Sequence, residues 1–285
     1  MTKLAILADI HGNLPALEAV WEDLGQFDVD HVVVAGDSIN WGPCSREVLE
    51  FLTEHHCVIM RGNHEYYLLD YNTPRAPEAW SGYTMNRWVH RQVGDGWRTR
   101  IATWPDTLCL RFADAPAVRV VHGSPGNHWK GIYPNTSDDE IRGMLASIEE
   151  PIVIAAHTHL ALDRVVDGWR IINPGSVGTP LDSIPDASYL LLESDDGAWC
   201  ARHRRIPIDP DHVLRAFNYQ EFINEHGVVG HLIMEEFRTA RIQLVAFLLW
   251  HRACYPDEPQ TFDLLEMFTN DVRWEHTFPA YHVNR

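Results

Sequence analysis

Positively charged side chains are scarce in this sequence of 285 residues, which contains 23 Lys and Arg against 40 Asp and Glu. The formal net charge is therefore −17 at pH 7. An acidic surface repels phosphate backbones and anionic lipids, so we expect neither non-specific nucleic-acid binding nor attachment to a membrane surface. A phosphate-bearing substrate would need a local source of positive charge other than Lys and Arg.

The sequence also lacks a cysteine framework and a long hydrophobic run. Its five cysteines include no Cys-x-x-Cys pair, and an odd, scattered set fits reduced thiols better than disulfides. The longest late apolar run, residues 244–250, is far shorter than the ~20 residues needed to cross a bilayer. Residues 1–13 lack the apolar core and cleavage site of a signal peptide. These absences predict a cytoplasmic protein without a membrane span.

Apolar runs that end in polar residues alternate with segments of helical periodicity in the first part of the chain. Residues 4–11, 31–37 and 57–65 have the β-branched, apolar character of buried strands. Residues 13–24 and 44–56 carry apolar positions at helical spacing. This alternation predicts βαβ units in a buried, parallel sheet of an α/β fold.

Further strands are expected downstream of this first part. The Asp-Gly pairs at 167–168 and 196–197 predict tight turns, and hence antiparallel hairpins joined to the parallel part. The expected strands are residues 107–112, 117–124, 151–157, 164–174, 188–194 and 199–206.

Two helical regions complete the predicted organisation. A tryptophan-rich insertion is expected at about residues 66–105, and the chain becomes helical from about residue 209 to its end. We therefore predict a domain over residues 1–208 that contains the insertion, followed by a helical C-terminal extension over residues 209–285.

Polar side chains capable of binding a metal follow five of the predicted strands. Any one of them alone would be interpreted as a loop residue or a turn. In open α/β sheets, however, ligands bind beyond the carboxyl ends of the strands, where these side chains would converge. The residues are Asp9, His11, Asp37, Asn63, His64, His122, His157 and His159.

The chemistry of this set favours a pair of divalent cations. Imidazole, carboxylate and amide oxygen suit Mn, Fe or Zn, and even seven ligands from these eight residues are too many for one tetrahedral site. Two divalent ions with Asp9, Asp37 and a bridging hydroxide would leave roughly one net positive charge. That charge is a local source of attraction for a phosphate ester on an acidic protein, and two such ions can activate water near neutral pH.

The ordered motifs D-I-H, G-D-S-I-N-W-G-P, R-G-N-H-E, V-H-G-S and A-H-T-H resemble those of the calcineurin-like metallophosphoesterase superfamily. The segment N-P-G-S-V-G-T-P, residues 173–180, resembles its small bacterial phosphoesterase and phosphodiesterase branch. The resemblance spans residues 4 to about 205. It implies a four-layer α/β/β/α sandwich with a dinuclear metal centre.

The resemblance also implies a role for each residue of the set. One metal would be held by Asp9, His11 and His159, the other by Asn63, His122 and His157, with Asp37 bridging them. His64 would be a catalytic acid that stabilises the transition state and protonates the leaving oxygen. Glu65 is interpreted as a first-turn residue of the next helix, where a carboxylate favours the helix dipole.

The sequence departs from the family at three positions. Ala156 stands where Gly usually precedes the H-x-H motif, and Asn40-Trp41 stands where the Ser/Thr protein phosphatases have Asp-Arg. Without that Arg, a singly charged diester fits better than a dianionic monoester. Asn40 could hydrogen-bond His64 or contact substrate, and Asn13 could contact substrate or simply cap a helix.

Three tryptophans of the insertion raise two alternatives. They could form an aromatic wall for a nucleobase or pack the insertion onto the domain. The residues are Trp80, Trp88 and Trp97.

The sequence thus predicts a cytoplasmic metal-dependent phosphoesterase that hydrolyses a phosphodiester, phosphomonoester or nucleotide by attack of metal-bound hydroxide. The cofactors would be two divalent ions, with Mn expected and Fe, Zn, Mg or Ni as alternatives. The partner would be a small phosphoester substrate, with homo-oligomerisation through the C-terminal helices left open. The alternative function is a catalytically silent scaffold of the same fold that binds other proteins.

Overall fold

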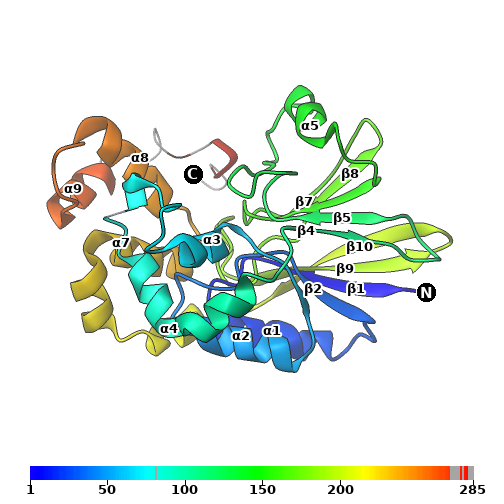
Figure 1. Ribbon diagram of the computed structural model, residues 1–285, viewed down its shortest axis with the longest axis horizontal. Helices are drawn as coiled ribbons and strands as arrows, with labels where there is room; N and C mark the ends of the chain where they lie inside the picture. Colours follow the sequence, from blue (N-terminus) through cyan, green and yellow to red (C-terminus); the bar gives the residue numbers. More distant parts are fainter. Residues whose placement is uncertain (81, 270–276, 278, 282–285) are drawn as a thin grey trace.

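The computed structural model describes residues 1–80, 82–269, 277 and 279–281 (Figure 1). Its strands form two five-stranded sheets. In the first sheet, in the order β10-β9-β1-β2-β3, β1, β2 and β3 are parallel, and β9 runs antiparallel to both β1 and β10. These strands are β1 (Lys3–Leu7), β2 (His31–Val34), β3 (Val58–Ile59), β9 (Ala187–Asp195) and β10 (Ala198–Ile206).

The second sheet has the order β4-β5-β6-β8-β7. Its three central strands are parallel, and β4 and β7 pair antiparallel at the two edges. Both sheets are therefore mixed. The strands are β4 (Thr107–Leu110), β5 (Val118–Val121), β6 (Ile152–Ala155), β7 (Leu162–Val166) and β8 (Trp169–Asn173).

Three apolar clusters hold the layers together. Leu4 and Ile6 meet Val120 and Ile154 between the two sheets. A second cluster fixes α1 (Leu14–Leu24) and α2 (Ser45–Glu54) to the outer face of the first sheet. A third fixes α5 (Asp138–Leu145) to the second sheet. Figure 1 shows these helices on opposite outer sides, which confirms the predicted four-layer sandwich.

The two predicted Asp-Gly turns both close hairpins. Asp167-Gly168 joins β7 to β8, and Asp196-Gly197 joins β9 to β10. All four residues have positive φ (47° and 93°, 46° and 76°), as a type I′ turn requires. The hairpins lie in different sheets, which their proximity in the sequence did not indicate.

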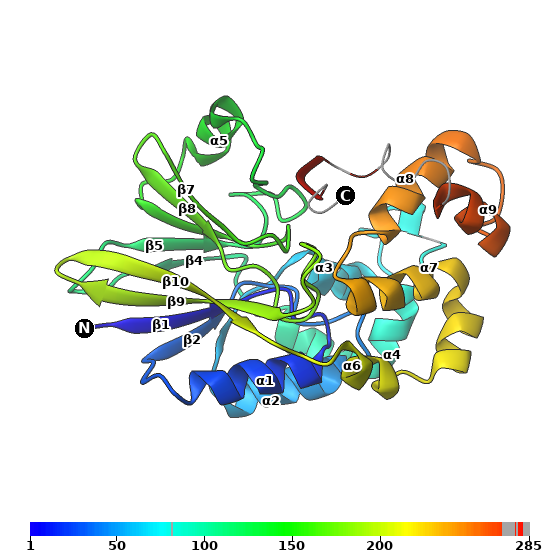
Figure 2. The same cartoon turned by 180° about the vertical axis from the view of Figure 1, so that it is seen from behind.

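The remaining helices gather at one end of the sandwich, as Figure 2 shows from the opposite side. Side chains from the insertion and from the C-terminal helices share one apolar cluster, which includes Met85, Phe222, Phe237 and Phe247. The elements are α3 (Asn63–Asp70), η1 (Glu78–Trp80), α4 (Met85–Ile101), α6 (Pro210–Ala216), α7 (Tyr219–Thr239), α8 (Leu244–Cys254), α9 (Phe262–Met267) and η4 (Pro279–Tyr281).

The helical stretch predicted from residue 209 is present over residues 210–267, with breaks that the periodicity did not reveal. Residues 270–276, 278 and 282–285 of the prediction lie outside the described residues. The predicted boundary falls in the connection between Ile206 and Pro210. Ala240 adopts a left-handed conformation at φ 51° and ends α7, and Gly227 at φ 53° bends it. The division of the chain into a domain and an extension stays a prediction. Among the described residues, no helix combines the length and the apolar character needed to span a bilayer.

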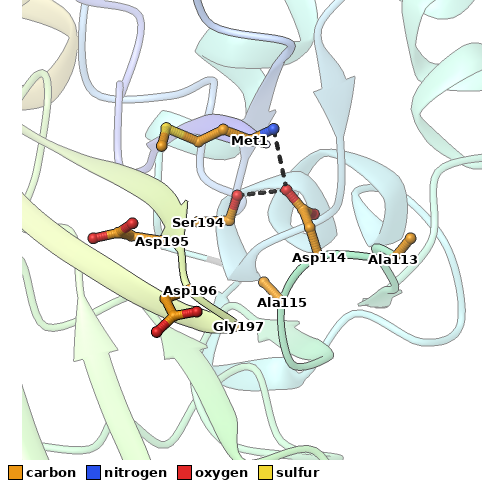
Figure 3. A pocket seen from close by; sticks show the side chains of 8 residues that line it. All are labelled: Met1, Ala113, Asp114, Ala115, Ser194, Asp195, Asp196 and Gly197. Atoms are coloured by element: carbon orange, nitrogen blue, oxygen red, sulfur yellow. Dashed lines mark hydrogen bonds and ion pairs between the residues drawn. The ribbon is translucent and has the colours of Figure 1, made fainter.

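The opposite end of the sandwich has an acidic hollow, lined in part by Asp195, Asp196 and Asp114 (Figure 3). Asp114 lies beside the start of β1. Its carboxylate accepts hydrogen bonds from the Ser194 hydroxyl at 2.6 Å and from the Thr2 backbone N–H at 2.8 Å. The amino group of Met1 lies 3.5 Å from the same carboxylate. The acidic hollow at this end is therefore organised around the start of β1, far from the carboxyl ends of the strands.

Candidate metal centre

The side chains predicted to bind metal follow directly on the strand ends, in an unusual backbone conformation. Asp9, His11, Asp37, His157 and His159 all have φ between 50° and 68°. Non-glycine residues rarely adopt this left-handed region, and each costs on the order of 1–3 kcal/mol. Such strain is concentrated at functional sites. Here it occurs at side chains that follow β1, β2 and β6 and that converge on one point.

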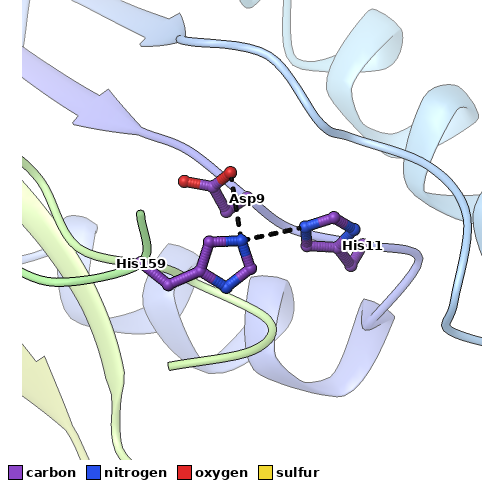
Figure 4. Close-up of side chains that lie close together, drawn as sticks. All are labelled: Asp9, His11 and His159. Atoms are coloured by element: carbon purple, nitrogen blue, oxygen red, sulfur yellow. Dashed lines mark hydrogen bonds and ion pairs between the residues drawn. The ribbon is translucent and has the colours of Figure 1, made fainter. Parts of the chain in front are cut away.

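The first cluster comprises Asp9, His11 and His159 (Figure 4). The Nε2 atoms of His11 and His159 lie 3.2 Å apart, and His159 Nε2 lies 3.4 Å from Asp9 Oδ1. All three residues are buried. They are the three ligands predicted for one of the two metals.

The second cluster comprises Asp37, His122 and His157, with Asn63 between the two imidazoles. Asn63 Oδ1 lies 2.9 Å from His122 Nε2 and 2.9 Å from His157 Nδ1. His122 Nε2 also lies 3.2 Å from Asp37 Oδ2. The structure thus brings together the ligands predicted for the second metal.

Asp37 lies between the two clusters. Its Oδ2 atom is 3.2 Å from His122 Nε2 and 3.7 Å from His11 Nε2. This is the position expected of the bridging carboxylate. All seven predicted ligands are therefore found at one place, although they are spread from residue 9 to residue 159 of the chain.

The donor set fits divalent cations on the evidence of its own contacts. Two imidazole nitrogens that face each other at 3.2 Å, as in His11 and His159, can share only one proton. Asp9 Oδ1 is buried and lacks a hydrogen-bond partner, although unpaired buried polar atoms are costly. A cation bound among these atoms would satisfy both.

Burial and charge act differently on the histidines of the centre. Burial lowers the pKa of His157 to about 3 and that of His11 well below its usual value, which leaves neutral rings with lone pairs. Burial also opposes the charging of His122, but the carboxylate of Asp37 raises its pKa to about 10. The centre therefore attracts positive charge at Asp37.

Backbone carbonyls orient two of the imidazoles from behind. His122 Nδ1 lies 2.9 Å from the carbonyl oxygen of Ala35, and His159 Nδ1 bonds that of Thr179. A hydrogen bond at Nδ1 fixes the tautomer and leaves Nε2 as the ligand atom. These outer contacts are typical of histidines that bind metals.

His64 lies beside the two clusters in the first turn of α3. It is buried, and its Nε2 atom is 4.0 Å from Asp37 Oδ2. Burial lowers its pKa to about 4. His64, His11 and Asp37 also lie close enough together to hold a metal ion. The geometry therefore fits His64 either as a metal ligand or as a catalytic acid.

The predicted substrate contacts have other partners in the structure. Asn13 Oδ1 caps α1 by accepting from Ala16 N at 3.1 Å, and its amide donates to the carbonyl of Gly178 at 2.8 Å. Asn40 accepts from the backbone N–H of Trp41, because its left-handed conformation, at φ 73°, turns the side chain back on the chain. The expected bond between Asn40 and His64 is absent among the described contacts, so that expectation is corrected. Their contact with substrate stays a prediction.

Two residues at the centre have roles that the sequence did not reveal. The carboxylate of Glu65 lies in the first turn of α3, as predicted, but it accepts hydrogen bonds from Asp37 N and Ser38 N at 3.0 and 2.8 Å. The ring of Trp41 stacks on that of His11, with centroids 4.6 Å apart. The only signal for Glu65 in the sequence was its position three residues after Gly62, which caps α3.

Two tryptophans of the insertion pack it onto neighbouring helices, and a nucleobase-binding role for any of the three stays a prediction. Trp88 packs between the helices against Phe222, and Trp97 belongs to an apolar cluster beneath α4. Trp80 instead contacts Tyr67, on the helix that begins at the metal centre.

Known proteins resemble the chain over the sandwich. The sequence profile described as the calcineurin-like phosphoesterase superfamily domain matches residues 2–197. Phosphodiesterase YfcE of Escherichia coli is 38% identical over 205 residues, which cover 68% of this chain and 89% of YfcE. The uncharacterized protein MJ0912 of Methanocaldococcus jannaschii is 26% identical over 211 residues, covering 68% and 84% of the two chains.

Solved structures support the same fold. A metallophosphoesterase from Sphaerobacter thermophilus superposes with a TM-score of 0.65 at 23% identity, covering 84% of this chain and 99% of the other. The hypothetical protein PH1004 from Pyrococcus horikoshii OT3 gives a TM-score of 0.68 at 20% identity, covering 80% and 99%. Together with the profile match over most of the sandwich, these findings show that the chain belongs to the calcineurin-like phosphoesterase superfamily.

Proposed function

We propose that this protein is a metal-dependent hydrolase of phosphoesters, with a preference for phosphodiesters. The observation that carries the proposal is the convergence of two buried donor clusters on Asp37. Asp9, His11 and His159 would hold one divalent cation, and Asn63, His122 and His157 the other. When bound, the two ions would supply positive charge to the phosphoryl oxygens and lower the pKa of water.

The residues of this chain would orient the metal ligands and supply a proton to the leaving group. His64 would donate a proton to the oxygen of the leaving group. Burial disfavours its charged form, and the charge of Asp37, 4.0 Å away, opposes that effect. Glu65 and the backbone carbonyls hold the ligands in position. The alternative function, a scaffold without catalysis, is not supported by any observation, because the complete donor set and His64 are all present.

The preference for diesters rests on charge. Trp41 occupies the position where a phosphate-binding Arg would add positive charge, so a dianionic monoester lacks one favourable interaction. The name of the YfcE relative, a phosphodiesterase, agrees with this preference.

The His64→Ala substitution tests the catalytic role. We expect the variant to retain its metal content but to hydrolyse bis-p-nitrophenyl phosphate at least ~10²-fold more slowly, the lower range for the loss of a general acid. Metal content is measured by plasma mass spectrometry, after stripping and reloading with Mn, Mg, Zn or Fe. His212→Ala, at an exposed position on α6, is the matched control. Equal turnover by His64→Ala and the wild type would exclude this role.

A further inference from the structure

Aromatic rings extend outward from His64 in a continuous series. Tyr67 follows His64 by one helical turn, and their rings meet edge-on with centroids 5.3 Å apart. Tyr67 contacts Trp80 at 4.5 Å and Trp129 at 5.1 Å, and those two lie 5.7 Å apart. Three separate segments therefore bring rings to one place: α3, η1 and the loop after β5. We refer to Tyr67, Trp80 and Trp129 as the aromatic wall.

The aromatic wall is accessible at Trp129. Among the tryptophans that the structure describes, Trp129 alone is exposed, with 42% of its surface accessible. Exposure of a large ring forgoes the hydrophobic free energy of burial. An aromatic ring exposed beside a site with metal donors is available to contact a ligand.

The wall borders the catalytic side of the centre. The ring of Tyr67 contacts that of His64, whose Nε2 atom lies 4.0 Å from Asp37 Oδ2. On its other side His64 meets the edge of Trp41, with centroids 4.8 Å apart. A group that receives a proton from His64 would thus leave into aromatic surroundings.

We propose that the substrate carries a planar aromatic group of the nucleobase class, which stacks on the aromatic wall while its phosphate lies at the metal centre. The inference rests on the proposed function, because the wall adjoins the residue assigned to the leaving group. Bases stack on aromatic side chains whatever their sequence identity, since every base has a π-face. An uncharged base also suits a chain with a net charge of −17 better than an additional anionic group does.

Binding of AMP and of ribose 5-phosphate to the manganese-loaded protein tests the inference. The two probes carry the same phosphate and differ by the base, and isothermal titration calorimetry measures their dissociation constants without turnover. We expect AMP to bind ~5- to 150-fold more tightly, the range for stacking one base. Trp129→Leu and Tyr67→Leu should each reduce that ratio at least ~3-fold and leave the affinity for ribose 5-phosphate unchanged.

A control variant and an activity assay separate the two proposals. Tyr219→Leu removes a ring that is 55% exposed on α7 and should leave the ratio unchanged. Equal affinity of the wild type for AMP and ribose 5-phosphate would overturn the inference, even if bis-p-nitrophenyl phosphate is hydrolysed. A base preference that depends on Trp129, without hydrolysis of any phosphoester, would instead overturn the proposed function and retain the wall as a nucleotide-binding surface.

Discussion

A single buried carboxylate, that of Glu65, joins two of the loops that carry the metal donors. Besides Asp37 and Ser38 it accepts from the backbone N–H of Gly62 at 2.6 Å. Burial and the negative charge of Asp37 raise its pKa to about 7, against the hydrogen bonds from Gly62 and Ser38 and the charge of His122, which stabilise the carboxylate. Removing one partner from such a network leaves buried groups unpaired, which costs more than the average hydrogen bond.

The Glu65→Gln substitution is therefore expected to weaken both the fold and metal binding. The glutamine amide has only one acceptor oxygen, and its NH₂ group would face backbone N–H groups that also donate. We therefore expect the free energy of unfolding to fall by ~1–3 kcal/mol. Metal affinity should fall ~10- to 100-fold, as for residues that orient ligands. Urea denaturation and metal titration measure the two effects. Glu47→Gln, at an exposed position, is the control, and unchanged stability and affinity in Glu65→Gln would refute this role.

At the scale of elements, residues 174–180 form a loop that holds the end of β1 in place. The backbone N–H groups of Val177 and Gly178 donate to the carbonyls of Ala8 and Asp9, both at 3.0 Å. The Ser176 hydroxyl donates to the Asp9 carbonyl at 2.7 Å. These contacts determine where the side chain of Asp9 lies, although the loop contributes no predicted ligand.

The Gly178→Ala substitution should disrupt this loop. A Cβ atom at this position would lie 1.8 Å from the carbonyl oxygen of Ile10, so the backbone must shift. We expect the free energy of unfolding to fall by ~3 kcal/mol or more, measured by urea denaturation. At Gly143, on α5, an added Cβ meets no neighbour, and Gly143→Ala should leave stability unchanged or slightly higher. A Gly178→Ala protein as stable as the wild type would show that the loop tolerates displacement.

A second contact between elements connects α1 to the hairpin of β9 and β10. Asp23 accepts from the Tyr189 hydroxyl at 2.6 Å and from both Nε and Nη2 of Arg204, at 3.1 and 2.6 Å. Burial opposes ionisation of Asp23, but the hydrogen bonds from Arg204 and Tyr189 outweigh it and hold the pKa below its usual value. The folded state therefore binds a proton less readily than the unfolded chain.

This contact should stabilise the fold at neutral pH and be lost in acid. The stabilisation is complete above the usual pKa of Asp, about 4, and disappears as the pH falls through the lowered pKa of the folded state. We expect Asp23→Asn to lower the free energy of unfolding of metal-free protein by ~1–3 kcal/mol at pH 7. The difference between variant and wild type should shrink below pH 4 in urea denaturation. A difference that grows towards low pH would contradict the sign of this argument.

At the scale of the whole molecule, the sequence predicted the sandwich and the composition of its metal centre. The alternation of apolar strands and amphipathic helices predicted a parallel sheet, and the resemblance to the calcineurin-like superfamily implied the four layers. The polar residues at five strand ends indicated where the site lies. That prediction was accessible because parallel strands place their carboxyl ends together whatever the loops do. Asp37 and His122, 85 positions apart in the chain, follow β2 and β5 of different sheets. Their contact therefore also depends on how the two sheets pack, which the sequence pattern did not reveal.

Other features depend on tertiary contacts that no local pattern encodes. The hairpins around Asp167 and Asp196 carry the same turn signal, yet the former lies in the second sheet and the latter in the first. Trp41 was recognised as a departure from the family, but its stacking on His11 requires the left-handed turn that the fold imposes. Trp129 gave no signal, because its neighbours in the wall lie on segments more than 45 residues away.

The central claim concerns the two cations, and anomalous diffraction from manganese-loaded crystals tests it most directly. The account predicts two peaks roughly 3.5–4 Å apart on either side of Asp37, one against Asp9, His11 and His159 and the other against Asn63, His122 and His157. A single peak, or manganese bound away from Asp37, would contradict it.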